Sequence, residues 1–122
     1  MTEEFKTKLI ANLQWLGEQI GREVEVIDKL SCNKGNYDRH FTGTSRFYFV
    51  IEHFGVAFSG AVGRIEGQNV HFEFKTDYIN RIERSGNELE MELDLDTKIS
   101  RLITFKIKEP GDNNMDGAHP SL

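Results

Sequence analysis

A ladder of carboxylates between residues 88 and 96 could do the most distinctive chemistry in this sequence. The ladder consists of Glu88, Glu90, Glu92, Asp94 and Asp96, with apolar residues between them. Side chains two apart in a β-strand lie on one face, roughly 6.6–6.8 Å apart. We therefore expect an acidic stripe, formed by these five residues, on the outer face of a strand whose other face is buried.

The acidic stripe predicts a protein partner with a basic surface or groove. Its charge spacing is similar to that of successive phosphates in a nucleic-acid strand, so the partner's groove could be one that otherwise holds nucleic acid. Pairing with the strand at 99–108 is expected to set Lys106 opposite the first glutamates and to leave most of the stripe without compensating charge. The alternative is a solvated face whose charges protect the sheet from edge pairing and aggregation.

A second candidate site lies in the longest irregular stretch, residues 31–45. It combines basic side chains with rings, at Lys34, Tyr37, Arg39, His40 and Phe41. Cationic groups beside aromatic rings are typical of sites that bind a phosphate or stack a base. This gives the alternative function, a barrel that binds a small molecule or a nucleotide. Its interior would be lined by Phe47, Phe49, Phe58, Phe72 and Phe74. The competing interpretation is a solvated loop whose rings fold back onto the core.

The sequence contains no recognisable catalytic or metal-binding pattern. Cys32 lies near His40 in the sequence, but no signature of a cysteine nucleophile surrounds it, and no P-loop or G-x-S-x-G motif occurs. His71 and Glu73 share a strand face and would supply two of the three or four ligands that a metal needs. Residues 112–117 match the first half of an EF-hand loop, without its glutamate at position twelve. We therefore predict a non-enzyme with no metal and no cofactor.

Composition limits the classes of partner and compartment. The 122 residues include 20 Asp and Glu against 15 Lys and Arg, a formal net charge of −5. This balance argues against general binding of nucleic acid or of anionic membranes, which requires a basic face. The only cysteine is Cys32, no apolar run approaches 18 residues, and the acidic start at Met1 lacks the pattern of a signal peptide. We expect a cytoplasmic protein that neither binds nucleic acid directly nor enters a membrane.

The first element that must position these residues is a helix over residues 2–20. Its apolar stripe recurs every three or four residues, at Phe5, Leu9, Leu13, Leu16 and Ile20. Thr2 is expected to cap the start and Gly21 to end the helix. Gly17, within the helix, indicates close packing against a sheet.

The rest of the domain reads as about seven strands separated by short turns. They are expected near 23–30, 46–53, 56–63, 70–75, 78–82, 88–95 and 99–108. Such closely spaced strands leave no room for helical crossovers, so the sheet should be mainly antiparallel. We predict an α+β domain over residues 1–110. The N-terminal amphipathic helix packs on a bent sheet or half-open barrel, and residues 111–122 form a flexible polar tail.

Overall fold

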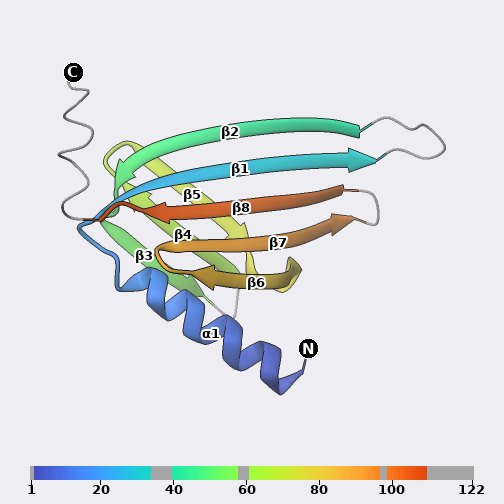
Figure 1. Cartoon of the computed structure of the whole chain (residues 1–122), viewed down its shortest axis with the longest axis horizontal. Coiled ribbons are helices and arrows are strands. Elements are labelled where there is room, and N and C mark those ends of the chain that lie inside the picture. Colours follow the sequence, from blue (N-terminus) through green and yellow to red (C-terminus); the bar gives the residue numbers. More distant parts are fainter. Residues whose placement is uncertain (1, 34–39, 58–60, 97–98, 110–122) are drawn as a thin grey trace.

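The computed structural model describes residues 2–33, 40–57, 61–96 and 99–109 (Figure 1). These residues form one α-helix, one 3-10 helix and eight strands, so the predicted α+β class is confirmed. The elements are α1 (Glu3–Gly17), β1 (Glu23–Asn33), β2 (His40–Val50), β3 (His53–Ala57), β4 (Val62–Gly67), β5 (Val70–Lys75), η1 (Thr76–Tyr78), β6 (Ile79–Ser85), β7 (Glu88–Asp96) and β8 (Ile99–Ile107). Among them no helix is both long and apolar enough to span a bilayer.

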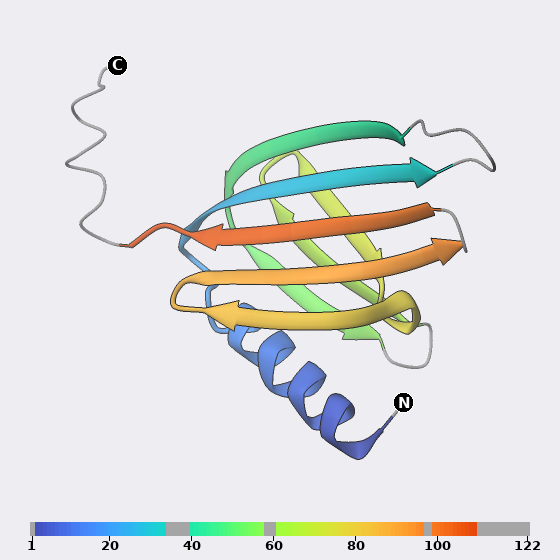
Figure 2. The ribbon, with the colours of Figure 1, turned by 45° about the vertical axis from the view of Figure 1, so that its right-hand side comes forward.

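The strands form two antiparallel sheets rather than one bent sheet. The larger has the order β2-β1-β8-β7-β6 and the smaller β3-β4-β5. Figures 1 and 2 show the small sheet crossing behind the large one. Helix α1 lies along one side of both sheets, where it contacts the edge strand β6 of the large sheet and the edge strand β3 of the small sheet. The sheets do not close into a barrel, and the helix occupies the open side, as predicted.

The chain passes from one sheet to the other at residues 51 and 52. The N–H of Ile51 donates to the carbonyl of Arg22, at 3.0 Å, and its carbonyl accepts from Gly21, at 2.8 Å. The N–H of Glu52 then donates to Glu66 of the small sheet at 2.8 Å. The predicted strand at 46–53 is therefore split between β2 and β3. The strand predicted at 56–63 is likewise two strands, β3 and β4.

Helix α1 begins as predicted and ends early. The Oγ1 of Thr2 accepts a hydrogen bond from the N–H of Phe5 at 3.1 Å, which satisfies one of the free donors of the first turn. The helix ends at Gly17, and Ile20 is 52% exposed, so the prediction of a helix to residue 20 with Ile20 on its buried face was wrong. A Cβ at Gly17 would lie 3.0 Å from the Phe54 ring, which confirms the close packing expected there.

The core fills the space between the sheets and under the helix. It includes Leu9, Leu13 and Leu16 of α1, together with inward residues of both sheets such as Ile65 and Phe105. At Gly63 of β4 the ring of Phe74 approaches the backbone so closely that a Cβ would overlap it.

The prediction of an irregular stretch was wrong for residues 31–33 and 40–45. Strand β1 continues to Asn33 and β2 begins at His40, with Ser31 opposite Thr42 in the antiparallel register. This segment is polar and rich in Gly, Ser and Thr, yet it forms a paired ladder because the backbone supplies the hydrogen bonds whatever the side chains. Residues 34–39 lie outside the described part, and so does the predicted tail at 111–122.

Candidate partner-binding surface

The outer face of the large sheet, turned away from the small sheet, carries the acidic stripe. On β7 burial alternates as the sequence predicts from Glu88 to Asp94, whereas Leu95, expected on the buried face, is 38% exposed. Leu89, Met91 and Leu93 are fully buried, while Glu88 and Asp94, which point the other way, are exposed. No described element covers this face in Figures 1 and 2. The alternation therefore presents the carboxylates to solvent.

The register between β7 and β8 agrees with the sequence prediction. Glu88 lies opposite Lys106, and the two groups form an ion pair of 3.6 Å. The partners of the next three carboxylates carry no charge; they are Thr104, Leu102 and Ser100. Strand β8 therefore compensates only the first charge of the stripe.

Strand β6 supplies a compensating charge that the sequence analysis missed. The Nη1 of Arg81 lies 3.1 Å from Glu90 and its Nε lies 3.5 Å from Glu92. The hydrogen bond with Glu90 raises the pKa of the Arg81 guanidinium above its ordinary value. An irregularity in the β6–β7 register between Ile79 and Arg81 brings Arg81 opposite Glu92. The expectation that most of the stripe lacks compensation was therefore wrong.

The excess of negative charge among the described residues lies beyond Glu88. Glu90 and Glu92 share one guanidinium, and Asp94 lies opposite Ser100 with no ion pair among the described residues. Asp96 follows at a register irregularity, opposite Ile99. Among the described residues, the part of β7 from Glu90 to Asp94 thus carries three carboxylates beside one guanidinium.

The part of the outer face nearer β2 is neutralised more completely. Glu25 of β1 accepts a hydrogen bond from the Tyr48 hydroxyl at 2.9 Å and lies 3.4 Å from the Arg46 guanidinium. On the same strand, Glu23 lies 3.4 Å from Lys108. Acidic β1 therefore lies between basic groups on β2 and β8, and the net charge of this part is small.

The residues of the second candidate site are not brought together in the described part of the structure. Lys34, Tyr37 and Arg39 lie outside it. His40 and Phe41 belong to β2 by their backbone and face Asn33 and Cys32 in the register. The described structure therefore assembles no phosphate or base site from these five residues.

The phenylalanines predicted to line a ligand cavity pack against one another. The ring centroids of Phe47 and Phe72 are 5.9 Å apart, and those of Phe72 and Phe74 each lie 6.1 Å from Phe105. Phe58 lies outside the described residues. Edge-to-face and tilted contacts of this kind are typical of a packed core.

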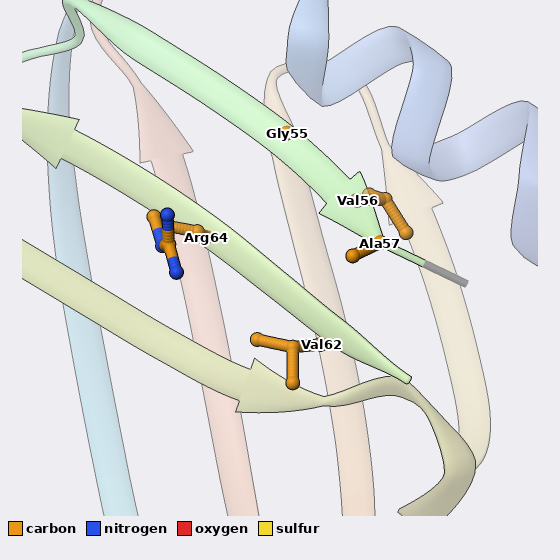
Figure 3. Close-up of a pocket in the computed structure, with 5 residues that line it drawn as sticks. All are labelled: Gly55, Val56, Ala57, Val62 and Arg64. Carbon is orange, nitrogen blue, oxygen red and sulfur yellow. The ribbon is translucent and has the colours of Figure 1, made fainter. Parts of the chain in front are cut away.

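A small hollow lies over β3 and β4 (Figure 3). Its volume is about 270 Å³, and it is lined by Gly55, Val56, Ala57, Val62 and Arg64. Sites for small molecules are usually larger, at about 300–1,000 Å³. The Arg64 guanidinium also lies 3.3 Å from Glu73, which partly neutralises its charge.

His71, on the exposed face of the small sheet, lies between two carboxylates. Its Nδ1 lies 2.7 Å from Glu66 and its Nε2 lies 2.7 Å from Glu73. The hydrogen bond to Glu73, followed by that to Glu66, raises the pKa of His71 above 6.5. The shared face of His71 and Glu73 is as predicted, but Glu66 comes from β4 and was missed. No group of three or more described His, Cys, Asp or Glu side chains is arranged to hold a metal ion.

Comparison with known proteins gave no match, whether the chain was compared with protein-family models, with curated proteins or with solved structures. The surface chemistry of the described residues therefore carries the functional argument.

Proposed function

We propose that the protein is a small binding module that docks the acidic end of β7 onto a basic surface of another protein, as an inhibitor, an immunity factor or an adaptor would. One observation carries this proposal. Glu90 and Glu92 share the single guanidinium of Arg81, and Asp94 has no ion pair among the described residues. An exposed row with excess negative charge attracts cationic groups and raises the rate of association with a basic partner.

A protein is a better partner for this surface than a nucleic acid. The chain carries a net charge of −5, and the stripe would repel phosphates. The paired strands fix the backbone of β7, so binding a partner orders side chains but no part of this backbone. A basic groove that otherwise holds nucleic acid matches such a row in sign and in spacing.

The alternative function, binding of a small molecule or a nucleotide in an aromatic interior, has less support. Phe72 and Phe74 are buried in contact with Phe105, so these rings fill the space that a ligand would need. The hollow beside Arg64 is small and open, and one ion-paired guanidinium supplies its charge.

The test compares capture of binding proteins by three tagged forms of the full chain. The first is the wild type, and the second carries Glu90→Gln, Glu92→Gln and Asp94→Asn. The third is a matched control in which Glu3, Glu4 and Glu18, which are exposed on and beside α1, are changed to Gln. Both variants lose three negative charges at different places, and the β7 variant also leaves Arg81 without its two carboxylate partners.

We expect quantitative mass spectrometry to identify one basic protein that the wild type and the control retain and the β7 variant loses. Recovery of the complex should also fall as salt is raised, because screening weakens exposed charge pairs. If the recovered protein binds the wild type and the β7 variant equally, the stripe is not the docking surface. If the best-retained species is a small molecule that co-purifies with all three forms, the alternative function replaces this one.

A further inference from the structure

Strand β2 is an unprotected edge of the large sheet. It is the last strand in the order β2-β1-β8-β7-β6 and pairs with β1 alone. Apart from this ladder, the described backbone between Gly43 and Phe49 makes no hydrogen bond within the described residues. Gly67 of β4 lies close to the Val50 carbonyl at the end of the strand, but in Figures 1 and 2 no described element lies beside the free side of the rest of β2. One side of this strand therefore presents N–H and C=O groups that can pair with another strand.

The other sheet edges are protected in ways that β2 is not. Strands β6 and β3 both contact α1. Strand β5 is only six residues long and carries His71, Glu73 and Lys75 on its exposed face. Strand β2 has eleven residues, contains no proline, and carries Arg46 as its only Lys, Arg, Asp or Glu. Natural proteins usually blunt edge strands by shortness, proline, charge or coverage. Apart from the single charge of Arg46, β2 has none of these features, which indicates that this edge is used.

Side chains beside the edge also favour contact. Tyr48 is 62% exposed and Val50 is 50% exposed, and both stand on the outer face of β2. The Tyr48 hydroxyl is held by Glu25, so the ring keeps a fixed position while most of its surface faces solvent. Covering these two side chains would bury apolar surface that the monomer leaves in water.

We propose that two copies of this chain pair through β2, antiparallel about a two-fold axis at Ser45, and so join two five-stranded sheets into one. Ser45 is the midpoint of β2, so this register pairs Thr42 with Tyr48 and the residues between them, while the Val50 end of the strand lies against Gly67 of β4. A second copy fits because the strand is complementary to itself. Arg46 of one copy lies opposite Thr44 of the other, and no like charges face each other directly.

The dimer would bring the outer faces of both copies into one surface. Each copy's β7 lies three strands away from β2 in the sheet order, so both acidic stripes would remain open. Two stripes on one rigid sheet can engage a partner with two basic sites more tightly than one stripe can. The dimer does not depend on the proposed function, because the stripe takes no part in the β2 pairing.

The test measures the molar mass of the full chain over a range of concentrations by sedimentation equilibrium. Thr44, which is exposed on β2, is changed to Lys in one variant and to Glu in another. In the proposed register, residue 44 of each copy lies opposite Arg46 of the other copy, so the dimer contains two such pairs. Thr44→Lys makes both pairs repulsive, and Thr44→Glu makes both attractive. Thr7→Lys, on the exposed face of α1, is the matched control.

We expect the wild type to change from 14.0 kDa to twice that mass as its concentration rises. Thr44→Lys should weaken the dimer and Thr44→Glu should strengthen it, each by roughly 2- to 30-fold in the dissociation constant. The control should match the wild type. A wild type that stays at the monomer mass at every concentration overturns the proposal. A dimer that Thr44→Lys and Thr44→Glu leave unchanged also overturns it, because the interface then lies elsewhere.

Discussion

Arg101 of β8 forms a bidentate ion pair with Asp28 of β1 on the inner face of the large sheet. Its Nε lies 3.0 Å from Oδ1 and its Nη2 lies 3.1 Å from Oδ2 of Asp28. The same guanidinium lies 5.2 Å from the centre of the Phe72 ring and donates to the carbonyl of Glu73 at 3.3 Å. The ion pair joins β1 and β8 within the large sheet, while the contacts of the same guanidinium with Phe72 and Glu73 connect this sheet to β5 of the small one.

Asp28→Ala should destabilise the fold by about 1–3 kcal/mol, because it leaves a largely buried guanidinium without its anion. The side chains of Asp28 and Arg101 are 19% and 21% exposed, so water compensates only part of the loss. Urea unfolding measures the change. Asp28→Ala combined with Arg101→Met should cost less than the sum of the two single variants. A strictly additive double variant would show that the pair contributes no coupling.

Leu13→Ala should lower the free energy of unfolding by about 2–5 kcal/mol, because it leaves a cavity under α1. Leu13 is 2% exposed and belongs to the core that the helix shares with both sheets. Gln14→Ala, one residue further along and exposed, is the control and should change stability by less than about 0.5 kcal/mol. A Leu13 variant as stable as the control would mean that α1 is a detachable arm.

Gly63→Ala should destabilise the protein by about 1–3 kcal/mol, because the added methyl group would overlap the Phe74 ring. Gly55→Ala, on the neighbouring strand, is the matched control because a Cβ there meets no atom within 4 Å. Thermal unfolding of both variants measures the difference. Equal melting temperatures would show that the core rearranges around Phe74 without cost.

The His71 cluster predicts a specific dependence of stability on pH. The pKa of His71 is raised above 6.5, mainly by Glu73, so its contribution is complete below 6.5 and is lost as pH rises through the raised value. The pKa of Glu73 is lowered below 4.5, mainly by His71, so its contribution is present above 4.5 and is lost as pH falls through the lowered value. The stability of the wild type relative to His71→Ala should therefore be greatest between 4.5 and 6.5. NMR titration of His71 measures the shift directly, and a midpoint at or below 6.5 would contradict it.

Asp94→Lys should slow association with the proposed basic partner while leaving the fold intact. Asp94 is exposed and forms no ion pair among the described residues, so the change leaves the two contacts of Arg81 in place. Stopped-flow association at two salt concentrations should show a slower rate and a flatter salt dependence. The double change Glu90→Lys and Glu92→Lys should slow association further, but it also removes both anions from Arg81. Rates unchanged by Asp94→Lys at both salt concentrations would reduce the stripe to a device for solubility.

The sequence predicted those elements whose side chains alternate or recur with a clear period. Strand β7 was located because Leu89, Met91 and Leu93 alternate with acidic residues, and its register with β8 followed from matching the apolar faces. The helix was located by its apolar stripe, although the stripe continued to Ile20 beyond the true end at Gly17. A repeating pattern shows which face is buried, but it does not show where the backbone turns away.

The features that sequence missed depend on contacts between strands. Arg81 reaches Glu90 and Glu92 because of a register irregularity between β6 and β7, which no local pattern reveals. Glu66 meets His71 because β4 pairs with β5. The polar composition of residues 40–45 predicts a loop, because polar residues are typical of loops. An edge strand with a solvated face has the same composition, so composition cannot separate the two.

The pairing of β1 with β8 has a consequence for how the chain folds. Val24 lies opposite Ile107, so the second strand that flanks β1 is the last strand of the described chain. During synthesis β1 and β2 can form a hairpin early, but the large sheet stays incomplete until β8 has left the ribosome. Because closing such a long loop costs entropy before any contact repays it, we expect refolding in milliseconds to seconds, slower than for helical domains of this size. Until then the apolar face of the early hairpin is exposed, and this is the period when the nascent chain most needs protection from aggregation.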